Sequence, residues 1–561
     1  MPSLFSYVNL SEVVSLYSRI FQRVESFKKK MNFKEFFQKN RINLLFSPLL
    51  VIFAYAALIF NSSYCADLEY VLGSKGSIYN WNELGRYTLI LLKKIFFTPY
   101  NVILESVLFV IFAYLTVISL AYLLYAINNK CNPIVIQLIS CAALIFPTYS
   151  EQFYFKFQAA EVMFGIFLAV LSGIFLLQYI NEKKIWALIV SVILNVLSFG
   201  IYQSMLNIVL VVYIGIFTCI SLKKENEKLL RAGIVFPLQF LVSFALNKLV
   251  CLLFCREGSY FADKIMWKQY SFDTCFHFVK HYFRIVLLGE RAVYAKSFIL
   301  ALILALIGLV FLFKKEKAKA IPALIGVIGL IIAPFTIAII QGFEPDSRTQ
   351  LALPFSIAFL MFFYSLIFID IISEYKYQKR SERSNFDEII SETVSLNWKN
   401  TKNQKAVLSY IIILPLSITS LLSLFQTCSL SFERMDINKS DNANIRKIAS
   451  DLKNFDCSED SETAVPVIII GTLSDEDSSD ITESKDYVLI SVFNLDADTE
   501  PKYFFSTNRI LSAMDIQGYR FKKPNVSTYM EDAYSLASDM PSFPSEGYIQ
   551  STDNFILVHL K

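Results

Sequence analysis

Charged residues are scarce in this 561-residue sequence: they make up 18% of it, whereas 55% of the residues are hydrophobic. A soluble protein of this length needs far more charge to cover its surface. The composition therefore excludes an ordinary soluble protein and indicates a polytopic membrane protein, in agreement with a mean hydropathy of +0.48.

A disulfide framework is also missing. The nine cysteines show no recurrent spacing, and four of them lie within or beside apolar stretches, where cysteine is usually a small hydrophobic residue. One pairing stays open, between Cys255 and Cys275, because both are expected in the same outer loop.

The first 42 residues contain no small-residue cleavage site, which argues against a removable signal peptide. They are too polar to cross a bilayer. The stretch LSEVVSLYSRIFQRVESFKKK places apolar residues at helical spacing with basic residues between them. This pattern favours an amphipathic helix on the inner leaflet, with a solvated cytoplasmic helix as the alternative.

Long apolar runs dominate what is present. A bilayer core needs about 20 apolar residues per helix. With that length as the criterion, we expect about eleven transmembrane helices, near residues 43–61, 103–127, 134–148, 160–180, 185–201, 204–222, 230–254, 297–313, 320–341, 350–374 and 406–428.

The loops between these spans predict the orientation. NEKK (181–184), KKENEK (223–228), KKEKAK (314–319) and KYQKRSER (376–383) are basic and fall on one side of the count, as does the N-terminal segment. Lys and Arg collect on the cytoplasmic side. We therefore expect the N-terminus inside, and an odd number of helices then puts the C-terminal part outside.

Charge divides the chain at the last span. Residues 429–561 carry 23 acidic against 12 basic side chains, a net charge of −11, which leaves +15 on residues 1–428. The basic excess is typical of cytoplasmic loops that face anionic lipid, and it does not indicate a nucleic-acid site. We expect three parts: a cytoplasmic segment (1–42), a transmembrane domain (43–428) and an extracytoplasmic α/β domain (429–561).

Short β-branched runs at 465–473, 487–493 and 554–560 are typical of strands in that last domain. Helical patterns alternate with them in NANIRKIASDLKNF, STNRILSAMDI and VSTYMEDAYSLASDM, the last with Ser527 as a candidate cap.

Two outer loops are long, 62–102 and 255–296, and both contain helical patterns suited to the membrane surface. In the first, NWNELGRYTLILLKKIFF is expected to form a surface helix. In the second, His277 and His281 stand four residues apart, but no third metal ligand is evident, so surface-helix residues are the better interpretation.

The first outer loop also carries a pair of acids, Asp67 and Glu69, directly after the first span. Charge near the hydrocarbon edge is costly unless it faces a water-filled cavity or a partner. A carboxylate there can act as a general base toward a hydroxyl group, whereas the alternative is a pair of solvated loop acids.

The order of these features resembles the GT-C class of integral-membrane glycosyltransferases, and within it the bacterial Gtr-type glucosyltransferases that modify O-antigens and related polysaccharides. CADLEYVLGSKGSIYNWNELGRYTLILL (65–92) resembles that family's acidic motif with its aromatic stretch and G-R-aromatic turn. MPSFPSEGYIQSTDNFILVHL (540–560) resembles its terminal pattern. Where the family often has two adjacent acids, this sequence has Asp67-Leu68-Glu69.

The resemblance implies an enzyme that transfers a sugar, by default glucose, from a polyprenyl-phosphate donor to a hydroxyl of a polysaccharide or O-antigen acceptor, in the bacterial cytoplasmic membrane. Asp67 would deprotonate the acceptor, and Glu69 would orient it or bind the donor sugar. No nucleotide is needed, and no glycine-rich phosphate loop is present. A divalent metal is optional, since Arg and Lys can balance the phosphate charge, and the sequence does not indicate one.

Candidate substrate-binding residues follow from the outer loops. Arg348 is the first choice for the donor phosphate, and a snorkelling arginine without a ligand is the alternative. The other candidates are Arg86, Arg284, Tyr79, Trp81, Glu151 and Lys156. Tyr149, Phe153 and Tyr154 are candidates for stacking on sugar rings, with interfacial anchoring as the alternative.

Two other functions stay open. A transporter or flippase of lipid-linked sugars would place charges near the bilayer midplane and show paired halves, and the sequence shows neither pattern clearly. A polysaccharide polymerase would have the same arrangement in the membrane but would use a different donor. The early acidic pair and the large outer domain favour the transferase.

Overall fold

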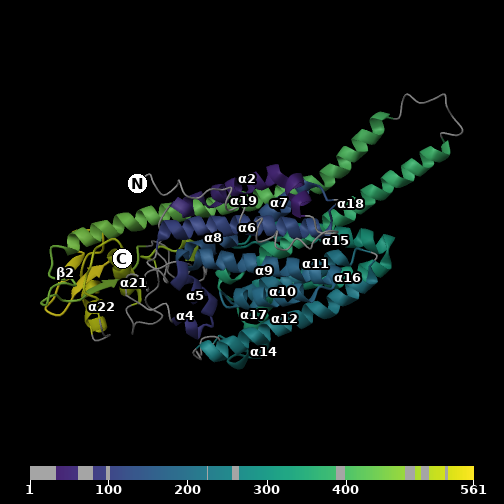
Figure 1. Cartoon of the computed structure of the whole chain (residues 1–561). Coiled ribbons are helices and arrows are strands. Elements are labelled where there is room, and N and C mark those ends of the chain that lie inside the picture. Colours follow the sequence, from purple (N-terminus) through teal and green to yellow (C-terminus); the bar gives the residue numbers. More distant parts are fainter. Residues whose placement is uncertain are drawn as a thin grey trace.

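The computed structural model describes a long helical body that carries a small α/β domain at one end (Figure 1). It describes residues 33–60, 80–96, 101–129, 131–223, 225–255, 264–386, 398–473, 487–494, 505–524 and 529–561. The predicted amphipathic helix before residue 32 lies outside these ranges.

Every predicted span coincides with one helix or with a pair of bent helices. These are α2 (Phe33–Phe60), α6 (Val102–Ile127), α7 (Pro133–Ala142) with α8 (Pro147–Tyr154), α9 (Lys156–Glu182), α10 (Ile185–Phe199), α11 (Met205–Ile220), α12 (Asn226–Phe254), α15 (Ser297–Lys315), α16 (Lys317–Ile332), α18 (Leu353–Phe386) and α19 (Trp398–Leu452).

Length and composition qualify fewer of these helices as membrane spans than the sequence predicted. Among the described residues, six helices are long and apolar enough to cross a bilayer, or up to eight if each bent pair forms one span. Three further apolar helices are shorter, at 185–199, 205–220 and 353–369. A mostly helical body with several candidate membrane spans is therefore confirmed, whereas the count of about eleven spans is not.

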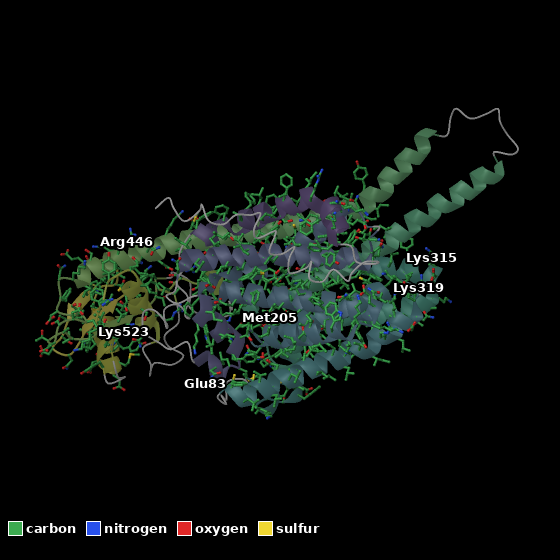
Figure 2. The ribbon with its side chains drawn as sticks, in the orientation of Figure 1. Glu83, Met205, Lys315, Lys319, Arg446 and Lys523 are labelled. Carbon is green, nitrogen blue, oxygen red and sulfur yellow. The ribbon has the colours of Figure 1, made fainter. Side chains whose placement is uncertain are left out.

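The residues labelled in Figure 2 distinguish the two ends of the body. Lys315 and Lys319, from one of the basic loops, lie at the end opposite to Glu83. Arg446 and the α/β domain lie beyond the Glu83 end. We call the Glu83 end the outer end, because the sequence predicts that it faces the outside.

Residues 149–159 lie between two predicted spans and were expected to form a short outer loop, but they are not a loop. α7 ends at Ala142, and Pro147 starts the new helix α8, because proline is favoured in the first turn, where its missing N–H costs nothing. Residues 147–162 are all buried, so this segment is a packed element of the body. Tyr149, Phe153 and Tyr154 are therefore not exposed to stack on sugar rings.

The predicted surface helix over residues 80–97 is broken in two. α4 (Asn80–Glu83) ends at a turn, and α5 (Tyr87–Phe96) begins after it. Gly85 has φ +70°, a conformation that residues with a Cβ rarely adopt, and the turn directs Arg86 into the body. The second long loop contains the 3-10 turn η2 (Met266–Lys268) and α14 (Phe272–Leu288), which Ser271 caps.

The α/β domain holds a three-stranded sheet of order β1-β3-β2. β1 (Val467–Ile470) is parallel to β3 (Ile556–His559), and β2 (Ile549–Ser551) is antiparallel to it. α21 (Phe505–Ile516) and α22 (Met530–Asp539) confirm two predicted helices. The run at 487–493 was expected to be a strand but forms the 3-10 turn η5 (Tyr487–Leu489), and Ser527 lies outside the described residues.

Two connections join the domain to the body. α19 runs without a break from the apolar body into the domain, where Ile445 and Leu452 belong to its core. Residues 487–494 form the second connection, and we call them the strap. Val488 packs in the core of the body, while Val492 and Phe493 pack in that of the domain.

Candidate functional site

A cavity of about 730 Å³ opens at the outer end of the body. It lies between the α4–α5 turn, the facing ends of α10, α11 and α12, and the segment after α17 (Thr336–Gln341). Its charged lining residues are Glu83, Arg86, Lys248, Lys264, Glu344, Asp346 and Arg348. Two of the arginines predicted from the sequence, Arg86 and Arg348, are thus brought together.

Arg86 is fixed in the cavity wall by contacts on two sides. Its guanidinium donates a hydrogen bond to Gln158 Oε1 at 3.0 Å and lies 4.7 Å from the ring centroid of Tyr202. The side chain is 8% exposed. A guanidinium presents its N–H groups in one plane, a geometry that matches the oxygens of a phosphate.

Arg348 lies in the 3-10 turn η4 (Ser347–Thr349) and also lines the cavity. Its guanidinium is 4.2 Å from the ring centroid of Phe155, and one nitrogen is 3.4 Å from Asp346 Oδ2. Lys264 approaches the same carboxylate oxygen at 4.0 Å. Asp346 is therefore shared by two cations of the lining.

Another acid of the lining is already paired. Glu344 forms an ion pair with Arg291, a residue of the loop after α14. The lining contains four cations, Arg86, Lys248, Lys264 and Arg348, against three acids, Glu83, Glu344 and Asp346. An anion that enters the cavity meets a net positive environment.

Apolar side chains form another part of the lining. Phe244 and Leu252 come from α12, and Ile337 and Ile340 from α17. The exposed faces of these two helices are apolar, with Leu249 and Ile340 among their exposed residues. The cavity therefore combines a positively charged wall with a flank that suits a hydrocarbon chain.

A second charged group lies at the same end of the helices and was missed by the sequence analysis. Lys93 of α5 pairs with Glu105 of α6 at 3.2 Å and with Glu161 of α9 at 2.8 Å, and all three side chains are at most 3% exposed. Glu105 Oε1 also accepts a hydrogen bond from the Ala160 N–H, in the first turns of α9, at 3.0 Å. The sequence offered one signal for this buried cluster, the position of its residues near the ends of predicted helices. Exposed charged residues occur at the same positions, so the signal does not distinguish the two.

Glu151 and Lys156 are buried in and after α8 and are not among the residues that line the cavity. Glu151 Oε2 accepts a hydrogen bond from the Val488 N–H of the strap at 2.8 Å. The Lys156 ammonium lies 5.7 Å from the ring centroid of Phe153. The structure therefore places Glu151 between the body and the α/β domain.

The other predicted residues are distributed more widely. Trp81 is buried against Phe157, with ring centroids 5.4 Å apart, and does not line the cavity. Arg284 is an exposed residue of α14 that pairs with Glu290 at 3.1 Å, also outside the lining. Asp67, Glu69 and Tyr79 lie outside the described residues.

No metal centre is formed by the residues that the structure describes: nowhere do three His, Cys, Asp or Glu side chains gather as metal ligands. The rings of His277 and His281 are stacked 6.5 Å apart on the exposed face of α14. Cys255 and Cys275 are free thiols, so the pairing left open by the sequence does not form. Burial and the neighbouring Cys251 raise the pKa of Cys255 to about 11, so this cavity residue stays protonated and is a poor nucleophile.

Comparison with known proteins adds a family to this geometry. No curated protein matches the chain. The family model described as "Glucosyl transferase GtrII" matches residues 55–365, from the second half of α2 to the first half of α18. The match spans more than half of the chain, includes the acidic pair and every residue of the cavity lining, and confirms the predicted resemblance. The chain belongs to the GtrII glucosyltransferase family.

Proposed function

We propose that this chain transfers glucose from a polyprenyl-phosphate donor to a hydroxyl group of a cell-surface polysaccharide or O-antigen. The observation that carries the proposal is the cavity at the outer end, which is lined by both Arg86 and Arg348. The two arginines come from loops that are far apart in the sequence. The family membership supplies the glucosyl transfer.

The donor phosphate would bind between the cations of the cavity. Arg348 and Lys264 would exchange part of their contact with Asp346 for the phosphate oxygens, and Arg86, which lines the same cavity, would add a third cation. Planar guanidinium groups bind phosphate through two parallel hydrogen bonds, and their positive charge stabilises the phosphate that leaves.

The prenyl chain would leave the cavity along its apolar flank. Phe244, Leu252, Ile337 and Ile340 line that flank, and α12 continues it with exposed apolar residues. Burial of hydrocarbon against these side chains, or in the lipid beside them, keeps the donor at the membrane surface with its phosphate in the cavity.

Asp67 would act as the general base, and Glu69 would orient the acceptor or the donor sugar. Both acids precede α4 in the sequence, and Glu83 at the end of α4 lines the cavity. In the reaction the acceptor hydroxyl gives its proton to the carboxylate, and its oxygen forms a bond to the anomeric carbon. The bond between that carbon and the phosphate oxygen breaks, and the lipid phosphate leaves.

We further propose that this chemistry occurs on the outer face of the bacterial cytoplasmic membrane, with the N-terminus inside and the α/β domain outside. The positions of Lys315 and Lys319 at the end opposite to the cavity support this orientation (Figure 2). Basic loops prefer the cytoplasmic side.

The decisive experiment replaces the acids one at a time. Asp67→Asn and Glu69→Gln are assayed for glucose transfer from polyprenyl-phosphate-glucose in vesicles, and folding is checked by size-exclusion chromatography. Loss of the general base is expected to lower kcat by about 10²–10⁴-fold. Asp273→Asn, at an exposed acid on α14, is the matched control and should keep full activity. Full transfer by both folded acid variants would refute the assignment.

Arg348→Ala tests the phosphate site separately. Loss of one charge-assisted contact is expected to raise KM for the donor by about tenfold or more, while KM for the acceptor stays unchanged. Arg348→Lys keeps the charge and should recover part of the donor affinity. An unchanged donor KM in a folded Arg348→Ala enzyme would remove the phosphate from this wall.

A further inference from the structure

A continuous stack of side chains connects the strap and α19 with the cavity. The Arg434 guanidinium lies 4.6 Å from the ring centroid of Tyr154, and the ring of Tyr154 meets Phe155 edge-on at 5.2 Å. On the other side, the Arg348 guanidinium lies 4.2 Å from the centroid of Phe155. Two arginines from different parts of the chain thus enclose two neighbouring rings of α8 and its end.

The Arg434 end of the stack is fixed by buried polar contacts. Its side chain is fully buried, donates a hydrogen bond to the Ile490 carbonyl of the strap at 2.6 Å, and lies 3.7 Å from Asp441 Oδ2. Asp441 in turn accepts hydrogen bonds from Ser491 and from the Val492 N–H. A guanidinium held by the strap backbone and a buried carboxylate has little freedom to move.

The strap also fixes α8 directly, through the hydrogen bond from the Val488 N–H to Glu151. Phe155 forms the junction between α8 and α9, with φ −77° and ψ 60° outside the helical region. The direction of its ring therefore depends on how α8 is held, and the strap contributes to that.

Arg348 forms the other end of the stack, at the cavity. It lies in a turn of three residues, and its contact with Asp346 at 3.4 Å is shared with Lys264. A planar guanidinium stacked on a ring keeps one orientation, which presents its N–H groups along one plane. The Phe155 ring is thus a platform that sets where those donors point in the cavity.

We propose that Arg434 is a positioning residue for Arg348, and that it acts through the rings of Tyr154 and Phe155. The α/β domain then contributes to donor binding without touching the donor, because the strap and α19 hold the far end of the stack. This inference rests on the proposed role of Arg348 as a ligand of the donor phosphate.

The test measures KM for polyprenyl-phosphate-glucose and kcat in purified, folded full-length variants. Tyr154→Leu removes the middle of the stack, and Arg434→Lys keeps the buried charge but loses the planar face. Both are expected to raise donor KM by about three- to tenfold and to leave acceptor KM unchanged, as the size of a cation–π contact implies. Tyr154→Phe keeps the ring and should stay within about twofold of wild type.

Tyr122→Leu is the control for the loss of a buried tyrosine. Tyr122 is buried and packs on Phe33 and Phe36, and it does not line the cavity. It should lower the thermal stability by an amount similar to that of Tyr154→Leu, with an unchanged donor KM. Unchanged donor KM in both Tyr154→Leu and Arg434→Lys would overturn the inference.

A double-mutant cycle separates this inference from the proposed function. If the stack acts through Arg348, Tyr154→Leu should have no further effect on donor KM in the Arg348→Ala background. Additive effects would overturn the positioning role and leave the phosphate site intact. If Arg348→Ala alone leaves donor KM unchanged, the phosphate assignment fails, and the inference fails with it.

Discussion

Two buried polar regions lie along the same helix, α9, and they differ in charge. Near the middle of the helix, Ser172 belongs to a neutral network that joins α9 to α10, α11 and α12. Its members are Ser172, Ser191, Asn195, Tyr213, Gln239 and Ser243, all buried. Eleven residues earlier, about 16 Å along the axis, Glu161 shares Lys93 with Glu105.

The neutral network consists of side chains that form hydrogen bonds with one another, although Asn195 Oδ1 is buried without a partner. The Tyr213 hydroxyl accepts a hydrogen bond from Asn195 Nδ2 at 2.8 Å and lies 2.8 Å from Ser172 Oγ. Gln239 donates to Ser191 at 3.0 Å. Such contacts hold helices together in lipid at a modest gain in stability. This region binds helices to each other and requires no ligand.

The outer region instead holds full charges out of water. Such a cluster gains little stability compared with apolar packing, because the desolvation of each ion is costly. It does fix geometry: Lys93 lies about two turns after Arg86 on the α5 segment, so its pairing with α6 and α9 registers Arg86 against Gln158. The difference between the regions indicates that buried charged side chains occur where they position a residue of the cavity wall.

Lys93→Met should break the outer region and give the largest effect of the stability predictions. It leaves Glu105 and Glu161 buried without their shared ammonium, and the expected loss is about 3–5 kcal/mol of unfolding free energy. Thermal or denaturant unfolding in detergent micelles measures it. Glu161→Gln leaves the pair of Lys93 with Glu105 and should cost clearly less. Equal losses in the two variants would contradict the shared-lysine account.

Tyr213→Phe should weaken the neutral network without touching catalysis. The hydroxyl is lost, and the expected destabilisation is about 1 kcal/mol, because its partners in the network can bond to one another. Glucose transfer, measured with saturating donor and acceptor, should match that of the wild type. A fall in kcat without unfolding would assign this region to the reaction and would erase the contrast.

The membrane body could be predicted well from the sequence because hydrophobic length is a property of each segment alone. Each predicted span coincides with a helix or a bent pair of helices, and the family was recognised from the order of local motifs. The helix α8 was missed since its polar composition, from Ser150 to Gln152, is typical of an exposed loop. Only the tertiary structure shows that this segment is enclosed by other helices.

The site was predicted less completely, for a related reason. Arg86 and Arg348 were chosen as cations of predicted outer loops, and both line the cavity. Lys264, which shares Asp346 with Arg348, has the same local appearance as many loop lysines. Partnerships between residues far apart in the sequence leave no local pattern, so Lys93, Arg434 and the strap could not be found.

Arg284 provides the smallest expected effect and the sharpest test of where the charged region ends. It was selected from the sequence on the same grounds as Arg86, but it is 67% exposed on α14, where Glu290 is its partner. Exposed pairs contribute about 0–1 kcal/mol, so Arg284→Ala should change unfolding by less than about 0.5 kcal/mol. Donor KM should stay within about twofold of the wild type, against the rise expected for Arg348→Ala. The two variants are assayed side by side in vesicles of one lipid composition. A severalfold rise in donor KM for Arg284→Ala would mean that α14 approaches the donor, and that burial does not separate the arginines that bind it from those that face the surroundings.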